Sequence, residues 1–248
     1  FDGKVDGRKI PDAGSPAKEV TGMLDMRQDG SGVLRPEYRE SDFDTYISSS
    51  QVRRFKLRPG DVVTGTARPP KDNERYWGLL RVDEVNETKV KELGERPKFM
   101  RLTPVYPDER IQLETGKEPL STRIIDLVAP IGYGQRGMVV SPPKAGKTTI
   151  LKDIATGVAA NDKKVHLMAV LIGERPEEVT DIRRHIAGVT NGTGEVAASN
   201  FDEPPKEQCR IAELALEKAK RMVEMGKNVV MLMDSITRLA RAYNLAIP

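Results

Sequence analysis

A lysine followed by two threonines marks the stretch with the clearest chemical meaning. Residues 141–149 read Ser-Pro-Pro-Lys-Ala-Gly-Lys-Thr-Thr, after the apolar run 138–140 and before the helix-like residues 150–155. A strand, a tight loop and a helix start, in this order, point loop amides and the helix N-terminus at one anion. We expect Lys147 to meet the β- and γ-phosphates of ATP and the Thr148 hydroxyl to hold Mg²⁺. A basic surface loop is the alternative.

Acidic residues that follow two other apolar runs could complete such a site. Glu174 and Arg175 come after the run 165–172, and Asp234 comes after the run 229–233. Because ligands of parallel sheets bind at the carboxyl ends of the strands, we expect these residues to converge on one nucleotide. Asp234 has the context of a magnesium-binding carboxylate, Glu174 that of a group that polarises water, and Arg175 could neutralise phosphate charge. Taken singly, each acid could instead be only a helix cap.

The elements that would position these groups alternate between strand and helix from about residue 121. Apolar runs predict strands at 138–140, 165–172, 195–199 and 229–233. Helical periodicity and capping signals predict helices at 147–160, from Pro176, and at 206–225. Alternation of this kind predicts a parallel sheet with ligands at its carboxyl edge.

The preceding part of the chain has a different texture, with short β-like runs separated by turns. Asp29-Gly30 is a hairpin signal, and the five runs are 21–28, 31–36, 44–52, 61–68 and 76–85. Five short strands in so few residues suggest a small closed barrel of the OB or cold-shock type. Such barrels commonly bind single-stranded nucleic acid, and basic and aromatic residues are available for this at Arg35, Tyr46, Arg53, Arg54, Arg68, Lys71, Arg75, Tyr76 and Trp77. Any one of these residues could instead belong to the core or to the solvated surface.

Composition excludes several other classes of protein. The 248 residues carry a net charge of +3, one cysteine (Cys209) and two histidines, which excludes an internal disulfide and makes a structural zinc site improbable. Apolar runs are too short for a membrane helix, and a cytoplasmic location is expected. The chain begins at Phe1 and stops at Pro248 directly after a helix-like segment, so we expect it to be a fragment of a longer protein.

Many segments, in order, resemble the Rho family of bacterial transcription termination factors. They cover nearly the whole chain and comprise Ser49 to Phe55, Arg68 to Lys71, Glu74 to Tyr76, Pro130 to Gly132, Gly134 to Gly137, Pro142 to Thr148, Glu174 to Thr180, Phe201 to Pro204 and Asp234 to Asn244. The resemblance implies a five-stranded OB or cold-shock-like barrel followed by an α/β RecA-like ATPase core, incomplete at its C-terminus. The expected division is a lead-in at 1–17, the barrel at 18–88, a connector at 89–120 and the ATPase domain at 121–248.

The same resemblance implies an activity, partners and site residues. It implies a homohexameric ATP-dependent RNA translocase, or helicase, that binds pyrimidine-rich single-stranded RNA and displaces RNA polymerase, with NusG as a candidate partner. The implied RNA contacts are Gly30, Ser31, Gly32, Val33, Leu34, Arg35, Asp44, Thr45, Tyr46, Glu74, Arg75 and Tyr76. The implied ATP contacts are Gly132, Tyr133, Gly134, Gln135, Arg136, Gly137, Lys144, Ala145, Gly146, Lys147, Thr148, Thr149 and Arg175, with Glu174, Lys147 and Asp234 catalytic and Thr148 and Asp234 on Mg²⁺.

Three positions, in two segments, depart from the pattern of the family. Ser31 and Val33 stand where the family usually has aromatic residues, so we expect weaker base binding there, or a shift onto Tyr46, Tyr76 and Trp77. Gly173 stands where the family usually has aspartate before Glu174. In the family, the channel loops and the arginine finger follow the position of Pro248, so we expect nucleotide and RNA binding at most from this chain alone.

Two other functions are compatible with parts of the sequence. A subunit of a rotary ATPase also pairs a small barrel with a phosphate-loop domain, although the basic and aromatic residues between 46 and 77 argue against it. A non-catalytic RNA-binding module with a vestigial nucleotide site is the second alternative.

Overall fold

The computed structural model describes residues 4–5, 8–9, 17–142 and 144–247. Contacts divide the chain into two compact units: unit 1 comprises residues 1–96 and 213–225, and unit 2 comprises residues 97–212 and 226–248. The predicted lead-in at 1–17 lies mostly outside the described residues. Two short strands within it, β1 (Lys4–Val5) and β2 (Arg8–Lys9), pair antiparallel.

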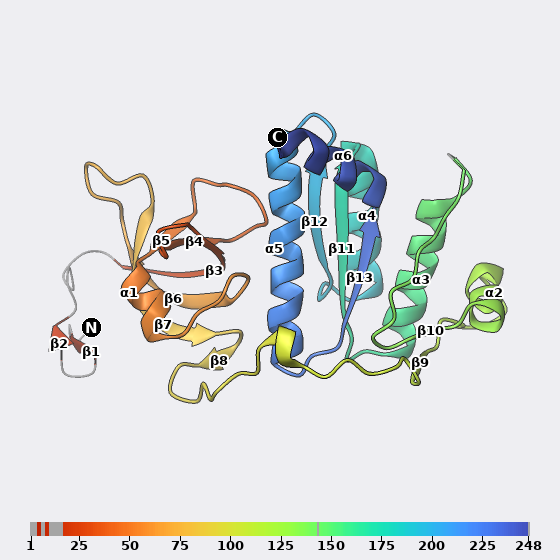
Figure 1. The fold of residues 1–248 in the computed structure, drawn as a ribbon, viewed down its shortest axis with the longest axis horizontal. Helices are drawn as coiled ribbons and strands as arrows, with labels where there is room; N and C mark the ends of the chain where they lie inside the picture. The colour runs from red at the N-terminus through yellow and green to blue at the C-terminus, as the bar shows by residue number, and fades with distance from the viewer. Residues whose placement is uncertain (1–3, 6–7, 10–16, 143, 248) are drawn as a thin grey trace. The chain divides into compact units, whose positions relative to one another are not determined.

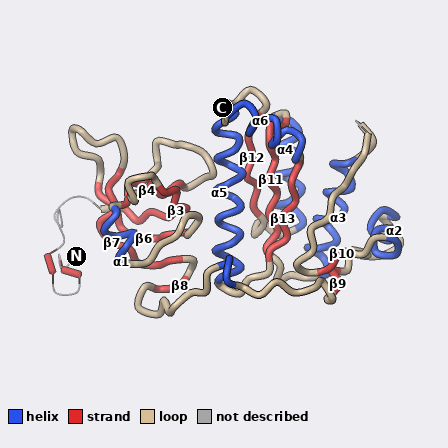
Figure 2. The backbone as a smooth tube through the Cα atoms, in the orientation of Figure 1, coloured by secondary structure: helices blue, strands red, loops and turns tan. Residues whose placement is uncertain are grey.

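Unit 1 contains the predicted barrel. The strand order is β5-β4-β3-β6-β7-β8, and a further parallel pairing between β5 and β7 closes the sheet. The strands are β3 (Lys18–Met26), β4 (Gly32–Arg35), β5 (Thr45–Ile47), β6 (Val62–Arg68), β7 (Trp77–Val85) and the two-residue β8 (Thr88–Lys89). In Figure 2, strands and loops dominate this part of the chain. The predicted five-stranded closed barrel is confirmed.

The barrel has a small apolar core, and its strands β6 and β7 approach each other unusually closely at Gly65. Leu24, Leu34, Ile47 and Val63 are fully buried in this core. Along β6 the buried positions alternate with half-buried ones, as expected for a strand with one face on a core. A Cβ at Gly65 would lie 2.0 Å from the carbonyl oxygen of Arg81. Only glycine therefore allows β6 and β7 to approach as they do.

The predicted strand at 44–52 is wrong over its second half. β5 ends at Ile47, and residues 49–54 form the helix α1 (Ser49–Arg54). Ser48 caps this helix: its Oγ accepts a hydrogen bond from the Gln51 amide at 3.4 Å, and the Gln51 side chain accepts one from the Ser48 amide at 3.3 Å. Such a capping box satisfies two backbone donors at the helix start and overrides the β-like composition of the segment.

Unit 2 is built on a three-stranded parallel sheet in the order β12-β11-β13. Figure 1 shows β11 between its two partners, with a helix after each strand. The elements are β11 (His166–Glu174), α4 (Pro176–Val189), β12 (Glu195–Asn200), α5 (Pro205–Glu224), β13 (Val229–Asp234) and α6 (Ile236–Ala246), preceded by α3 (Lys147–Asn161). These bounds lie within two residues of the predicted strands and helices. Residues 213–224 of α5 are counted with unit 1.

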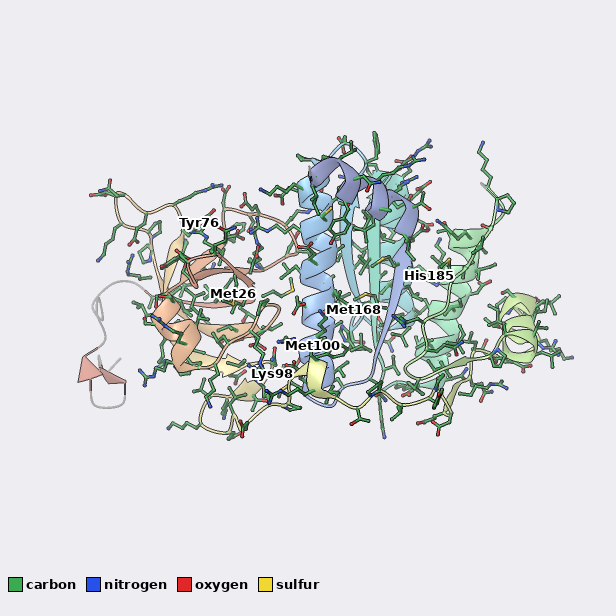
Figure 3. All side chains as sticks on the ribbon, viewed as in Figure 1. Met26, Tyr76, Lys98, Met100, Met168 and His185 are labelled. Carbon is green, nitrogen blue, oxygen red and sulfur yellow. The ribbon has the colours of Figure 1, made fainter. Side chains whose placement is uncertain are left out.

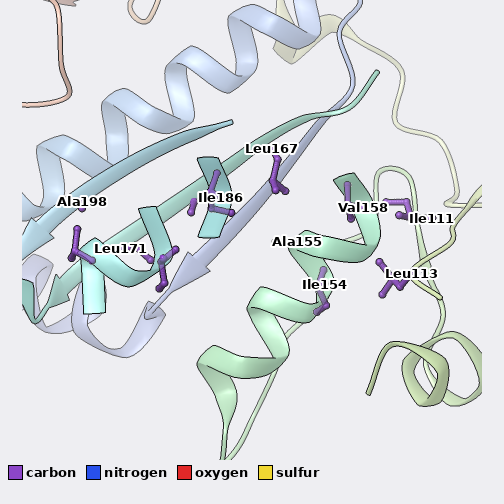
Figure 4. Close-up of a cluster of buried hydrophobic side chains, with 12 residues drawn as sticks. Ile111, Leu113, Ile154, Ala155, Val158, Leu167, Leu171, Ile186 and Ala198 are labelled. Carbon is purple, nitrogen blue, oxygen red and sulfur yellow. The ribbon is translucent and has the colours of Figure 1, made fainter. Parts of the chain in front are cut away.

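The core of unit 2 lies between this sheet and helices α3 and α4. Leu167 and Leu171 of β11 pack with Ile154 and Val158 of α3 and Ile186 of α4 (Figure 4). β11 is buried along nearly all of its length, as expected for a strand covered on both faces. The carboxyl ends of β11 and β13 are thereby fixed at one edge of the sheet. The remaining elements are η1 (Phe99–Arg101), β9 (Arg110–Ile111), α2 (Leu120–Val128) and β10 (Ile131–Gly132), of which β9 and β10 pair antiparallel.

The predicted strand at 138–140 is wrong. These residues pair with no strand in the described part of the chain, and the side chains of Met138 and Val140 are 75% and 82% exposed. The apolar run is only three residues long and is followed by Pro142 and Pro143, which lack the amide hydrogen that a strand pairing needs. The phosphate loop is therefore reached through extended chain outside the sheet.

Candidate nucleotide and RNA sites

The phosphate loop ends where helix α3 begins. Gly146 is the N-cap of α3 with a φ of 88°, in the left-handed region that favours glycine. The Gly146 carbonyl accepts the first helical hydrogen bond, from the Ile150 amide at 3.0 Å. Lys144, Ala145, Gly146 and Thr149 are exposed, as the predicted contact with a nucleotide requires. Free amides at a helix start form a site that favours a phosphate group.

Three of the predicted nucleotide residues converge at the end of β13. The Lys147 ammonium forms an ion pair with one carboxylate oxygen of Asp234. The Thr148 hydroxyl donates a hydrogen bond to the other oxygen at 3.4 Å. Asp234 is only 2% exposed. The structure thus brings the phosphate-loop lysine, the hydroxyl and the strand-end carboxylate together, as the sequence predicted.

The residues around Asp234 fit a magnesium ion that is shared with a nucleotide. In the described part of the chain, no group of three or more histidine, cysteine, aspartate or glutamate side chains could hold a metal ion. Mg²⁺ is commonly bound by one or two protein oxygens together with substrate phosphates and water. The Thr148 hydroxyl and the Asp234 carboxylate supply such oxygens, so a metal here needs the phosphates to complete its coordination.

Glu174 lies at the end of β11, at the same edge of the sheet. It is 7% exposed, and its Oε2 lies 2.9 Å from Nη1 of Arg238. Burial raises the pKa of Glu174 to about 7, a hydrogen bond with Glu178 also raises it, and the Arg238 guanidinium opposes the increase. A carboxyl group with a pKa near 7 can accept a proton at physiological pH and release it again.

The other predicted nucleotide residues have mixed environments. Arg175 is exposed at the start of α4. Gly134, Gln135, Arg136 and Gly137 are also exposed, whereas Gly132 is buried. The Tyr133 ring packs against the core of unit 2, and burial together with a hydrogen bond to Asp162 raises the pKa of its hydroxyl to about 12. Tyr133 therefore supports the fold, and the predicted contacts in this segment stay predictions.

A cavity of about 570 Å³ opens on the barrel of unit 1. Four of the predicted RNA residues line it: Tyr46, Glu74, Arg75 and Tyr76. The Arg75 guanidinium lies 5.1 Å from the centre of the Tyr76 ring, a cation–π distance, and Tyr76 is labelled in Figure 3. Glu74 is held by two hydrogen bonds from Arg68, at 2.6 and 2.8 Å, which lower the pKa of Glu74 to about 2. The cavity thus combines aromatic faces, guanidinium groups and a fixed carboxylate.

Most of the other predicted RNA residues are buried in the barrel. The buried set is Ser31, Gly32, Val33, Leu34, Arg35, Asp44 and Thr45, whereas Gly30 is half-buried at a turn. Ser31 is 3% exposed and donates to the Asp29 carboxylate, and Val33 and Leu34 are 3% and 1% exposed. The structure does not bring these side chains to the cavity surface. Their direct contact with RNA stays a prediction.

Arg35 shows why a basic residue in a strand need not face a ligand. It is 2% exposed and donates to Asp25 at 2.6 Å, to Asp44 at 3.1 Å and to Glu40 at 3.4 Å. Burial raises the pKa of Asp44, although hydrogen bonding from Ser41 and the charge of Arg35 oppose the increase. Arg35 is the centre of a buried ion network that joins β3, β4 and the loop before β5.

Residues that sequence reasoning had not assigned to RNA also surround the cavity. Arg27 lies 5.6 Å from the centre of the Tyr76 ring. Nε2 of the Gln51 side chain donates to the carbonyl oxygens of Leu79 and Leu80. The cavity is also lined by Arg68, which the sequence had already offered for nucleic-acid binding, and by residues that it had not: Ser48, Ser50, Gln51, Gly78, Leu79 and Leu80. Arg27 directly follows β3 and Tyr76 directly precedes β7, and no spacing in the sequence relates these two residues. They lie close together because the barrel is closed.

Two families of known domains match this chain. Residues 20–91 match the RNA-binding domain of the Rho termination factor, and residues 121–245 match the nucleotide-binding domain of the ATP synthase alpha/beta family. The chain belongs to the ATP synthase alpha/beta family. The first match covers the barrel and its cavity, and the second covers Lys147, Thr148, Glu174 and Asp234.

Curated relatives match this chain over most of its length. The chain is 55% identical over 231 residues to the transcription termination factor Rho of Bacillus subtilis, covering 92% of this chain and 53% of the relative. It is 50% identical to the factors of Pseudomonas aeruginosa and Mycobacterium bovis, covering 92% of this chain and 54% and 38% of theirs. The predicted resemblance to Rho is confirmed, and the chain spans about half the length of the first of these relatives.

Among the helices of the described residues, none combines the length and the apolar character needed to cross a bilayer.

Proposed function

We propose that this chain is the RNA-binding and nucleotide-binding part of an ATP-dependent RNA translocase that terminates transcription. The observation that carries the proposal is the presence, in one chain, of the aromatic and basic barrel cavity and of the Lys147, Thr148 and Asp234 cluster. A rotary ATPase subunit needs the second feature but not the first. The match of residues 20–91 to an RNA-binding domain supports the same choice.

In the proposed hydrolysis, Lys147 leaves Asp234 and binds the β- and γ-phosphates of ATP. Thr148 and Asp234 would hold Mg²⁺, which neutralises phosphate charge when bound. Glu174, with its pKa near 7, accepts a proton from the attacking water. Arg175, exposed beside it, meets charge on the phosphates.

In the proposed RNA site, Tyr76 and Tyr46 stack unpaired bases, and Arg75 and Arg27 hold the RNA backbone. Stacking on an aromatic side chain stabilises a bound base by about 1 to 3 kcal/mol. A preference for pyrimidines, a homohexameric assembly, RNA polymerase and NusG as partners and a cytoplasmic location are parts of the same proposal. They rest on the similarity to the Rho factors.

The test uses the full-length protein that contains this chain. We expect ATP hydrolysis to be stimulated strongly by poly(C) and weakly or not at all by double-stranded RNA. Absence of any stimulation by RNA would contradict the proposed translocase and favour one of the alternatives, a rotary-type subunit or a non-catalytic RNA-binding module.

Lys147→Ala separates the two sites. We expect ATP binding, measured with a fluorescent analogue, to weaken by at least about 100-fold, because two charge-assisted contacts to the phosphates are lost. Binding of a labelled oligo(C) should stay within twofold of wild type. Equal loss of both activities would show that the variant is unfolded or that the two sites are not separate.

A further inference from the structure

Gly173 interrupts the regular pairing of β11 just before Glu174. The register with β12 shifts between Leu171 and Glu174, so that Glu174 pairs with Asn200. Gly173 has a φ of 66°, in the left-handed region, and its amide donates to the Ser199 hydroxyl at 3.1 Å. A bulge with a left-handed glycine re-aims the side chain that follows it. The direction of the Glu174 side chain is therefore set by this bulge.

Arg238, in the first turn of α6, occupies the space beside the bulge. Its Nη1 donates to the Gly173 carbonyl and lies 2.9 Å from Oε2 of Glu174. The helix that carries it is capped by Ser235, whose Oγ accepts from the Arg238 amide at 3.4 Å. Arg238 thus bridges the backbone of the bulge and the carboxylate that the bulge presents.

We propose that Gly173 and Arg238 together form a clamp that positions the Glu174 carboxylate for attack of water on ATP. The clamp consists of the Gly173 bulge, the Arg238 guanidinium and the Glu174 carboxylate. Arg238 and Gly173 are positioning residues, since they act through Glu174. The inference rests on the proposed function of Glu174 as the proton acceptor.

Arg238 packs closely against the position where a side chain of residue 173 would begin. A Cβ there would lie 3.3 Å from Cδ of Arg238 and 3.4 Å from Oε1 of Gln208. The Arg238 side chain would have to move by a few tenths of an ångström, and the left-handed backbone would be strained for any residue with a Cβ. An aspartate at 173 would in addition offer Arg238 a second carboxylate in competition with Glu174.

The charged groups around Glu174 come from three further elements. Glu178 of α4 and Asp234 of β13 raise the pKa of Glu174, and Arg238 of α6 lowers it. The hydrogen bond with Glu174 lowers the pKa of Glu178, and Arg175 and Arg238 lower it further. Arg238 is therefore the cation among these groups that opposes the rise in the pKa of Glu174.

The experiment compares RNA-stimulated ATP hydrolysis by full-length Arg238→Gln, Arg238→Lys and Gly173→Ala proteins. We expect Arg238→Gln to lower kcat about 100-fold with KM within twofold, because small displacements of a reacting group cost rates of this order. The kcat of Arg238→Lys should be higher than that of Arg238→Gln. The kcat of Gly173→Ala should lie between those of Arg238→Lys and wild type. Because Arg238 lowers the pKa of Glu174, its replacement by glutamine should also move the increase of kcat with pH to higher pH.

Arg241→Gln is the matched control, since Arg241 is exposed on the same helix. Its kcat should stay within twofold of wild type. An unchanged kcat for Arg238→Gln, in a protein that Glu174→Gln inactivates, overturns the clamp and leaves the proposed function standing. A wild-type protein without RNA-stimulated hydrolysis overturns the proposed function instead.

A crystal structure of the full-length Arg238→Gln protein tests the clamp without reference to activity. A Glu174 carboxylate turned away from its wild-type position supports the clamp. A carboxylate in the wild-type position contradicts it, whatever the rate of hydrolysis.

Discussion

The two candidate sites differ in whether the cationic side chains proposed to bind a ligand are already paired with carboxylates of the same site. In the barrel cavity, Tyr46 and Arg75 are exposed to solvent, and the carboxylate of Glu74 is already fixed by Arg68. At the sheet edge, the cations are paired with carboxylates of the same site: Lys147 with Asp234, and Arg238 with Glu174. The barrel cavity can accept a ligand without breaking an ion pair between its own residues. At the sheet edge, Lys147 must leave Asp234 before it can bind a phosphate.

This difference follows from the two frameworks. A closed barrel presents side chains on a surface that needs no rearrangement, so binding there costs little ordering of the protein. A strand-end cluster buries its carboxylates, and buried charges need a partner at all times. RNA binding should therefore respond to the loss of single surface contacts, and hydrolysis to changes in the internal pairs.

The largest effect is expected at the sheet edge. Glu174→Gln should lower kcat for ATP about 10²- to 10⁴-fold, because the amide cannot accept the proton from water. Nucleotide affinity should change little. In wild type, kcat should rise as pH increases through about 7, because the pKa of Glu174 is raised to that value and only the ionised form accepts a proton. Steady-state ATPase assays between pH 5.5 and 8.5 measure both effects, and a profile without this limb would exclude Glu174 as the base.

The next effect concerns stability of the barrel. Arg35→Leu should lower the free energy of unfolding by about 3 to 5 kcal/mol, because Asp25 and Asp44 lose the cation that compensates their burial. Denaturant unfolding of the variant measures it. Arg53→Leu, at an exposed position of α1, is the control and should change stability by less than about 0.5 kcal/mol. Loss of RNA affinity by a fully stable Arg35→Leu protein would instead assign Arg35 to RNA.

A smaller effect is expected for Tyr76, an aromatic residue that lines the cavity. Tyr76→Ala should weaken binding of oligo(C) by about 1 to 3 kcal/mol if the ring stacks a base. Phe43→Ala is the matched control, because Phe43 is 71% exposed and does not line the cavity. Fluorescence anisotropy with a labelled oligonucleotide gives both affinities. Equal affinities for Tyr76→Ala and wild type would place the RNA site elsewhere.

The smallest effect is expected at Arg27. Arg27→Gln removes a guanidinium from the Tyr76 ring and from the path of the RNA backbone, and should cost about 0.5 to 1 kcal/mol of binding free energy. If Arg27 contacts a phosphate, the slope of log affinity against log salt should become shallower by about 0.7. A change in affinity with an unchanged salt slope would assign Arg27 to packing on Tyr76 alone.

Local patterns in the sequence were sufficient to predict most elements and the grouping of Lys147, Thr148 and Asp234. Apolar runs predicted β11 and β13 because strands buried on both faces have continuous apolar side chains. Since parallel strands end at one edge, Glu174, Asp234 and the start of α3 could be assigned to one site. Two strand predictions were wrong. The apolar run at 138–140 is too short to indicate a strand, and at 49–52 the capping box of Ser48 favours a helix over a strand.

By itself, the sequence determined two regions, one β and one α/β, and the residue types that can bind phosphate, because these depend on periodicity and neighbouring residues. The tertiary structure alone decided which side chains line a cavity and which are buried in the core. Arg35 and Arg75 are indistinguishable as basic residues near strands, yet the first is 2% exposed in an ion network and the second lines the cavity. The pairing of Arg238 with Glu174 and of Arg27 with Tyr76 likewise joins residues far apart in the chain, which only the closed barrel and the packed sheet bring together.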